Sequence, residues 1–195
     1  MKETSIDQAY WEQRWLNGST GWDVGAPTPP LKDYIDQLTD KSTRILIPGC
    51  GNAYEADYLL SKGFTAVTLL DIAKPAVEQL QQRYAGNACI RVLHEDFFQH
   101  QQSYDLILEQ TFFCALDPAL RRDYVEHMHR LLHPGGTLAG VLFGREFTDP
   151  GPPFGGSKEA YEKLFSAFFT IHTLAPCYNS IGPRAGTEIF VIAKS

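Results

Sequence analysis

The sequence predicts an α/β fold with a mostly parallel sheet of seven strands and an antiparallel hairpin at its C-terminus. Short apolar runs alternate with helix-like segments between residues 44 and 168, which is typical of βαβ units. The last two apolar runs, 169–176 and 187–194, have no helix between them, so one of these strands should be antiparallel. A glycine-rich turn, Gly49-Cys50-Gly51, ends the first strand at a point where a ligand can approach the main chain.

The first forty residues precede this alternation. Residues 5–17 predict a short amphipathic helix that carries Trp11 and Trp15. Residues 17–30 are rich in glycine and proline, which predicts a loop, and a second helix is expected over 31–39.

The alternating part of the chain supplies the remaining elements. Strands are expected at 44–48, 66–71, 89–96, 104–110 and 137–144. Helices are expected at 52–62, 75–85, 118–132 and 157–168. Ser157 is a candidate N-cap, and the His-Pro-Gly-Gly stretch at 133–136 should end the helix before it. The loop 145–156 follows the carboxyl end of a strand, where open α/β sheets bind their ligands.

Length and composition limit the functions that are open to the chain. Its 195 residues, 44% of them apolar, fit one globular domain over residues 1–195. A net charge of −6 without a basic block argues against a nucleic-acid partner. No apolar run is long enough to span a bilayer, and the four cysteines are too widely spaced for a zinc site. We therefore expect a cytoplasmic monomer with reduced thiols, no metal and no membrane contact.

The glycine turn is followed by an acidic residue at the next strand end. Asp71 lies about 20 positions beyond Gly49, the spacing expected for a carboxylate that accepts hydrogen bonds from ribose hydroxyls. Glycine-rich turns also occur in α/β proteins that bind no nucleoside. Tyr54 stands where a dinucleotide fingerprint needs its third glycine, which disfavours a nicotinamide cofactor.

A third strand end adds chemistry suited to adenine. Asp96 could accept from the adenine amino group, and Phe97 could pack on the base. The structural alternative is an aspartate that caps a turn beside a core phenylalanine. Together the three strand ends predict an S-adenosylmethionine pocket, with Gly49 and Gly51 beside the methionyl part and Asp71 on the ribose.

The sequence as a whole resembles the thiopurine methyltransferase-like proteins, most closely their thiol and halide methyltransferase branch. The resemblance covers most of the chain. It rests on the segments YWEQRWLNGSTGWDVGAPTP, LIPGCGNAYEADYLLSKGF, LDIAKPAVE, HEDFF, YDLILEQTFFCALDP, LLHPGGTL, DPGPPF and IGPRAGTEIFVIAK.

The resemblance implies a class I methyltransferase fold, a Rossmann-like α/β sandwich, in which residues 1–40 form an N-terminal lid and its helices. It also implies which residues line the cofactor pocket. These are Trp11, Trp15, Trp22, Gly49, Gly51, Asp71, Ile72, Asp96, Phe97 and Gln110. The tryptophans would cover bound S-adenosylmethionine, although they could also simply pack the N-terminal helix onto the sheet edge.

Two positions depart from the family pattern. Relatives carry tyrosine at the place of Gln110, which puts its cofactor role in doubt. Some thiol and halide relatives end the GPPF segment in tyrosine, where this chain has Phe154.

The methyl acceptor should be a small, soft nucleophile such as a thiol, sulfide, thiocyanate, halide, or a selenium or tellurium species. Arg145 could attract an anionic acceptor, and Arg184 is a second candidate. Apolar walls for the acceptor pocket are expected from Phe112, Phe113, Phe143, Phe147 and Phe154. Three alternatives stay open at this point: a nicotinamide-dependent oxidoreductase, a non-catalytic S-adenosylmethionine binder, and a methyltransferase for another small molecule.

Overall fold

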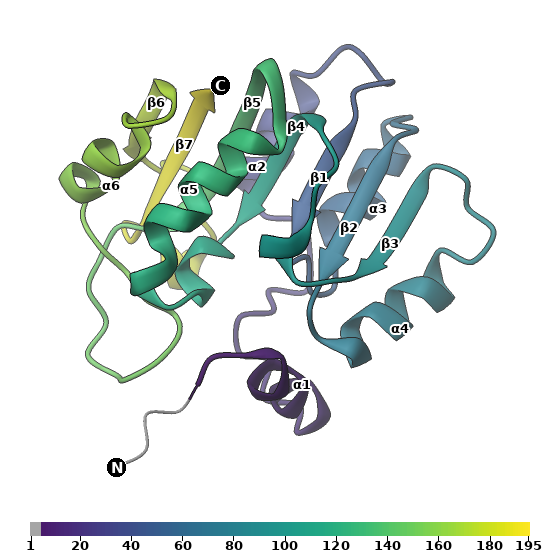
Figure 1. Ribbon diagram of the computed structural model, residues 1–195, viewed down its shortest axis with the longest axis horizontal. Helices are drawn as coiled ribbons and strands as arrows, with labels where there is room; N and C mark the ends of the chain where they lie inside the picture. The colour runs from purple at the N-terminus through teal and green to yellow at the C-terminus, as the bar shows by residue number, and fades with distance from the viewer. Residues whose placement is uncertain (1–4) are drawn as a thin grey trace.

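A computed structural model describes residues 5–195 of the chain (Figure 1). It contains a seven-stranded sheet with the strand order β3-β2-β1-β4-β5-β7-β6. The strands are β1 (Ile45–Pro48), β2 (Val67–Asp71), β3 (Ile90–His94), β4 (Tyr104–Gln110), β5 (Leu132–Phe143), β6 (Thr170–Pro176) and β7 (Glu188–Lys194). The first five strands pair in parallel, while β7 runs antiparallel to both β5 and β6. The predicted α/β class and C-terminal hairpin are confirmed.

The α-helices in this part of the chain are α1 (Gln8–Leu16), α2 (Pro29–Asp36), α3 (Tyr54–Ser61), α4 (Lys74–Arg83), α5 (Arg121–Arg130) and α6 (Lys158–Phe165). Short 3₁₀ turns follow β3 and β4 and precede α5 and β7. Figure 1 shows α5 and α6 on one face of the sheet, with α2 and α3 on the other. The layers form a three-layer sandwich, as expected.

Two apolar clusters fill the spaces between these layers. Ile107, Leu138 and Leu142 from the central strands pack against α5 and α6 residues such as Tyr124 and Phe165. The alternate residues of the same strands face the opposite cluster, beneath α2, α3 and α4. Because successive side chains of a strand point to opposite faces, continuous apolar runs cover both faces of the sheet.

Most element boundaries differ from the sequence prediction by one to three residues, and two of the differences have a clear local cause. Helix α5 ends at Arg130, and β5 already begins at Leu132, so residues 133–136 lie inside the strand instead of ending the helix. Leu132 pairs with Tyr104 and Thr137 with Leu106, so four residues bulge out between these pairs. Gly135 accommodates the bulge with its positive φ of 79°.

The second difference concerns α2, which begins at Pro29 and ends at Asp36 instead of covering 31–39. The two prolines occupy the first turn, where a missing N–H leaves no hydrogen bond unmade. The predicted N-cap of α6 is confirmed, since the Ser157 hydroxyl accepts from the Ala160 N–H at 3.2 Å.

The parallel strands all end at one edge of the sheet, and α1 lies across this edge (Figure 1). The helix contacts α4 through Glu12, whose carboxylate accepts from the Lys74 N–H at 3.4 Å. The Gln8 amide lies 3.5 Å from the His94 ring at the end of β3. These contacts bring the N-terminal segment over the three strand ends that the sequence singled out.

Candidate functional site

A cavity of about 650 Å³ opens at the carboxyl edge of the sheet, beneath α1. Its lining includes every residue that the sequence analysis assigned to the cofactor: Trp11, Trp15, Trp22, Gly49, Gly51, Asp71, Ile72, Asp96, Phe97 and Gln110. Phe112, Phe143, Phe147 and Arg145 from the predicted acceptor pocket line the same cavity. Segments that are far apart in the sequence therefore meet around one hollow.

The glycine turn has a backbone that favours glycine. Gly49 and Gly51 have φ values of 55° and 53°, in the left-handed region. A Cβ on Gly49 would overlap the ring of Phe112, which packs directly on this glycine. A Cβ on Gly51 would lie 3.9 Å from the indole nitrogen of Trp22. The turn is thus the place where the tryptophans of the N-terminal segment and the β4 loop approach the first strand.

The Asp71 carboxylate is held rigidly at the end of β2. One oxygen accepts from the Gly51 N–H at 2.9 Å, and the other accepts from the Ala73 N–H at 2.9 Å. The side chain is only 8% exposed, and this burial raises the pKa of Asp71 above its ordinary value. Each carboxylate oxygen has a second lone pair, so the group can still accept from hydroxyls in the cavity.

Asp96 and Phe97 combine a structural role with a place in the cavity wall. Asp96 caps the 3₁₀ turn after β3 by accepting from the Phe98 N–H at 3.0 Å. The buried Phe97 ring packs edge-on against Phe112, with ring centroids 5.3 Å apart. The structural alternative for this pair is therefore realised, and the same two residues also line the cavity.

The three tryptophans form an aromatic wall over the glycine turn. The centroid of the Trp22 ring lies 5.5 Å from that of Trp11 and 6.2 Å from that of Trp15, both in edge-to-face arrangements. Since Trp11 and Trp15 are one helical turn apart on α1, Trp22 packs along the face of the helix that looks into the cavity.

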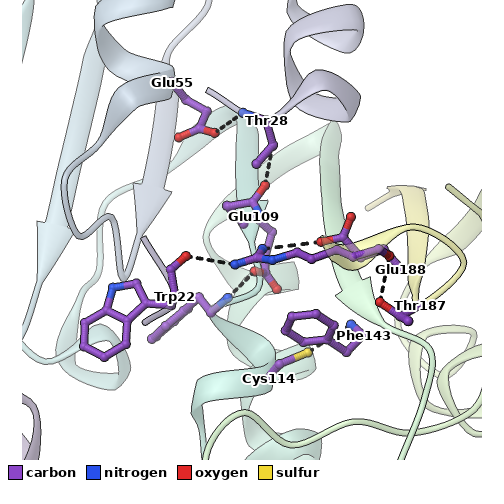
Figure 2. A network of polar contacts seen from close by, with 11 residues as sticks. Trp22, Thr28, Glu55, Glu109, Cys114, Phe143, Thr187 and Glu188 are labelled. Atoms are coloured by element: carbon purple, nitrogen blue, oxygen red, sulfur yellow. Dashed lines mark hydrogen bonds and ion pairs between the residues drawn. The ribbon is translucent and has the colours of Figure 1, made fainter. Parts of the chain in front are cut away.

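Gln110 ends β4 with its amide at the cavity wall. Its oxygen accepts from the Thr28 hydroxyl at 2.5 Å, and the Thr28 N–H donates to Glu55 at 3.2 Å, as Figure 2 shows for Thr28 and Glu55. The Gln110 amide nitrogen is buried and has no hydrogen-bond partner within the described chain. A ligand acceptor in the cavity would satisfy this donor.

Two predicted wall residues do not reach the cavity. Phe113 is fully buried in the core, where it packs against Tyr124 and Tyr161 with centroids 5.1 and 5.3 Å away. Phe154 is tied down through its backbone, whose N–H donates to the Cys114 carbonyl at 2.6 Å. Pro152 and Pro153 of the same loop line the cavity in its place.

Three arginines line the cavity, and the sequence analysis named two of them, Arg145 and Arg184. Arg145 is exposed and lies 4.7 Å from the Phe147 ring centroid. Arg184 is only 12% exposed, forms an ion pair with Glu188 at 3.4 Å and donates to the Trp22 carbonyl at 2.8 Å (Figure 2). Arg14 projects from α1, and its position between two tryptophans was the only feature of the sequence that could have indicated its place in the cavity.

Glu109 was also missed, although it organises the turn after β4. Its buried carboxylate accepts from the N–H groups of Phe112 and Phe113 at 2.6 and 3.1 Å and from the Tyr124 hydroxyl at 3.0 Å. Burial raises the pKa of Glu109 to about 7. Gly140 on β5 leaves room for it, because a Cβ there would overlap the Glu109 side chain and carbonyl. A lone glutamate in the apolar strand YDLILEQ was the available signal.

Two further observations concern metals and membranes. Within residues 5–195, no group of three histidine, cysteine, aspartate or glutamate side chains is arranged to hold a metal ion. Helices of the described chain are too short or too polar to cross a bilayer.

Comparison with known proteins shows which family the chain with this cavity belongs to. The family model for thiopurine S-methyltransferase matches residues 6–188. The chain belongs to the thiopurine S-methyltransferase family. It is 36% identical over 184 residues to a probable thiol methyltransferase 2 of Arabidopsis thaliana, covering 91% of this chain and 81% of the relative. It is 30% identical over 190 residues to thiocyanate methyltransferase 1 of Brassica oleracea, covering 94% and 84% of the two chains.

A solved structure confirms the class I methyltransferase fold. It is the 1,6-didemethyltoxoflavin-N1-methyltransferase of Burkholderia thailandensis, with bound 1,6-didemethyltoxoflavin and S-adenosylhomocysteine. The TM-score is 0.75 at 20% identity, with 96% of this chain and 86% of that chain covered. As a member of the thiopurine S-methyltransferase family, this chain is an S-adenosylmethionine-dependent methyltransferase, and the nicotinamide and non-catalytic alternatives no longer apply.

The residues present fit the cofactor of this methyltransferase. The main chain at Gly51 lines the cavity beneath Trp15 and Trp22, while the Phe112 ring packs on Gly49. The fixed Asp71 carboxylate can accept from vicinal hydroxyls, and the unpartnered Gln110 amide can donate to an acceptor. Trp11, Trp15 and Trp22 offer aromatic faces, which attract a sulfonium cation.

Proposed function

We propose that this enzyme methylates a small, soft and preferably anionic nucleophile. Thiols, sulfide, thiocyanate, iodide and related selenium or tellurium species belong to this class. The observation that carries the proposal is the make-up of the cavity wall at the ends of β4 and β5. It combines Phe112, Phe143 and Phe147 with Arg145 and with the prolines of the 152–153 loop.

This wall offers no obvious general base. Across residues 5–195, the titratable groups that line the cavity are Asp7, Asp71 and Asp96 and three arginines. Asp71 ends β2 and Asp96 follows β3, both on the proposed cofactor side. Asp7 caps α1 by accepting from the Tyr10 N–H at 3.1 Å. An acceptor that is already deprotonated near neutral pH suits such a wall better than one that must first lose a proton.

The chemistry asks little of the protein beyond position and environment. S-adenosylmethionine supplies an electrophilic methyl group with a good leaving group. The phenylalanine-lined wall at the ends of β4 and β5 holds the acceptor and excludes water, which raises the reactivity of an anionic nucleophile. Fixed alignment of the two reactants can contribute roughly 7–11 kcal/mol. Arg145 would draw the anion toward this wall from solvent.

The names of the relatives agree with this class of acceptor. The proteins from Arabidopsis thaliana and Brassica oleracea are called a probable thiol methyltransferase and a thiocyanate methyltransferase. Phe154, the position where some thiol and halide relatives carry tyrosine, lies outside the cavity lining here. The hydroxyl that those relatives carry at this position therefore has no counterpart in the acceptor wall proposed here.

An acceptor screen with radiolabelled methyl donor tests the proposal. It should include thiocyanate, iodide, sulfide, a simple thiol, a phenol and an amine. Activity with the thiol should rise with pH toward the thiol pKa near 8.5, because the thiolate is the nucleophile. Activity with thiocyanate should stay flat over the same range, since thiocyanate is already anionic. Methylation of the phenol or the amine, with none of the sulfur compounds or iodide used, would refute the proposed acceptor class.

We also propose that the enzyme acts on a small molecule as a cytoplasmic monomer without a nucleic-acid partner. The net charge of −6 and the four free cysteines support this interpretation. Sedimentation analysis of the purified protein would test the monomeric state.

A further inference from the structure

Arg14 is a cation in the cavity wall that has no counter-charge within residues 5–195. It projects from α1 into the cavity lining, and its Nε atom is buried without a hydrogen-bond partner among residues 5–195. Its Nη1 atom makes only a long contact of 3.4 Å with the Tyr10 hydroxyl. In this part of the chain, no carboxylate lies within ion-pair distance of the Arg14 guanidinium.

Two other arginines in or near the cavity wall, Arg184 and Arg121, are already engaged. Arg184 pairs with Glu188 at 3.4 Å and also donates to the Trp22 carbonyl. Arg121 donates to the Gly155 carbonyl at 2.8 Å. A partly buried guanidinium without such partners carries an uncompensated desolvation cost, which an anionic ligand group would relieve.

The position of Arg14 indicates which anionic group of a ligand could bind to it. Its guanidinium lies 5.4 Å from the Trp22 ring centroid, and the Trp22 indole nitrogen stands over Gly51. Arg14 and Gly51 thus share Trp22 as a neighbour in the cavity lining, whereas Arg145 lies beside Phe147 after β5. The glycine turn is the place that the sequence assigned to the methionyl part of the cofactor, and the carboxylate of that part is the one anionic group of S-adenosylmethionine.

We propose that Arg14 binds the methionyl carboxylate of S-adenosylmethionine and so couples helix α1 to the cofactor. The inference rests on the proposed placement of the cofactor over Gly49 and Gly51. The planar guanidinium matches a carboxylate in a bidentate pair, and the buried Nε–H is one of the donors that such a pair uses. The aromatic wall then closes because the helix that carries Trp11 and Trp15 is held by this ion pair.

Calorimetry with two ligands tests the inference directly. S-adenosylhomocysteine carries the carboxylate, and 5′-methylthioadenosine lacks the whole amino-acid part. Arg14→Met removes the charge while keeping the length of the side chain. It should weaken S-adenosylhomocysteine binding by roughly 10- to 100-fold, the effect of losing a charged hydrogen-bonded partner. Binding of 5′-methylthioadenosine should change by less than about twofold, because that ligand makes no contact with Arg14.

Two further variants act as controls. Arg14→Lys keeps the charge and should recover part of the lost affinity. Arg122→Met removes an exposed arginine that also lies near an aromatic ring, 5.6 Å from the Phe168 centroid, but outside the cavity lining. It should leave the affinity for both ligands unchanged.

Three results would overturn the inference. Equal weakening of both ligands by Arg14→Met would mean that Arg14 only packs the helix. Unchanged affinity for S-adenosylhomocysteine would mean that the carboxylate is bound elsewhere. Failure of the unmodified protein to bind either ligand would remove the cofactor placement as well, and it differs from the first two results because it appears before any substitution.

Discussion

The two sides of the cavity differ in charge and in the kind of side chain that they present. The side at the ends of β2 and β3 carries Asp71 and Asp96 with the glycine turn beside them. The side at the ends of β4 and β5 and the start of β7 carries aromatic rings, prolines and the arginines Arg145 and Arg184. Acceptor oxygens on the first side suit hydroxyl and amino donors, whereas the second side suits a weakly hydrated anion.

This difference explains how one cavity can hold two reactants in a fixed order. A cofactor with ribose hydroxyls and an amino group is favoured on the acidic side. An anion is favoured on the basic side and repelled by the two aspartates. Gly49 and Phe112 are in contact where the two sides meet, so the reacting groups should approach each other there.

The largest effect is expected from Asp71→Ala. The substitution removes the acceptor proposed for the ribose hydroxyls and leaves the N–H groups of Gly51 and Ala73 without their partner. Affinity for S-adenosylhomocysteine should fall by roughly 3 kcal/mol or more, since each hydrogen bond to a charged group contributes about 1.5–3 kcal/mol. Calorimetry measures this change, and an unaltered dissociation constant would mean that the acidic side does not bind the ribose.

Gly49→Ala should disturb the contact where the two sides meet. The added methyl group overlaps the Phe112 ring and sits at a positive φ of 55°, so we expect a loss of about 2–4 kcal/mol of unfolding free energy. Gly25→Ala is a matched control, because Gly25 has a φ of 74° and open space around it, and it should cost only about 1 kcal/mol. Urea denaturation of both variants provides the measurement, and equal losses would show that the Phe112 contact is unimportant.

Glu109, beneath the aromatic side, should make stability depend on pH. Burial raises its pKa from 4.5 to about 7, so its contribution to stability is fully present below pH 4.5 and is lost as the pH rises through about 7. The loss should reach about 3 kcal/mol, at 1.36 kcal/mol for each pKa unit. Asp71 and Glu55, whose pKa values burial also raises, add a slope of the same sign.

The Glu109→Gln variant isolates the contribution of Glu109 to the pH dependence of the unfolding free energy. Urea denaturation at pH 5 and pH 8 should give a smaller difference in unfolding free energy for the variant than for the unmodified protein. The same slope in both proteins would mean that Glu109 is ionised throughout this pH range, with its three hydrogen-bond donors outweighing burial.

The smallest effect is expected from Arg145→Met on the basic side. Arg145 is exposed, so the loss of its charge should raise the KM for thiocyanate by only about fivefold, or roughly 1 kcal/mol. The KM for a neutral acceptor should be unchanged, and the thiocyanate effect should shrink in high salt. Steady-state kinetics at two salt concentrations would check both points, and an equal rise for the neutral acceptor would assign Arg145 a role in shape instead of charge.

The sequence by itself determined the fold class and the acidic side of the cavity. Strand alternation gives the sheet, and the carboxyl ends of parallel strands share one edge, so Gly49, Asp71 and Asp96 must lie near one another. These signals depend on residues that are close together in the chain, so they can be recognised in the sequence alone. The prolines of α2 and the bulge at 133–136 were misread because a proline–glycine pattern is compatible with more than one local structure.

Only the tertiary structure decided which side chains complete the cavity wall. Phe112 reaches the cavity while its neighbour Phe113 enters the core, because the turn fixed by Glu109 points successive rings in different directions. Within residues 5–195, Arg184 has an ion-pair partner in Glu188, whereas Arg14 has none and lies beside the Trp22 ring. Pairing, burial and side-chain direction arise from contacts between segments far apart in sequence, and no local pattern encodes them.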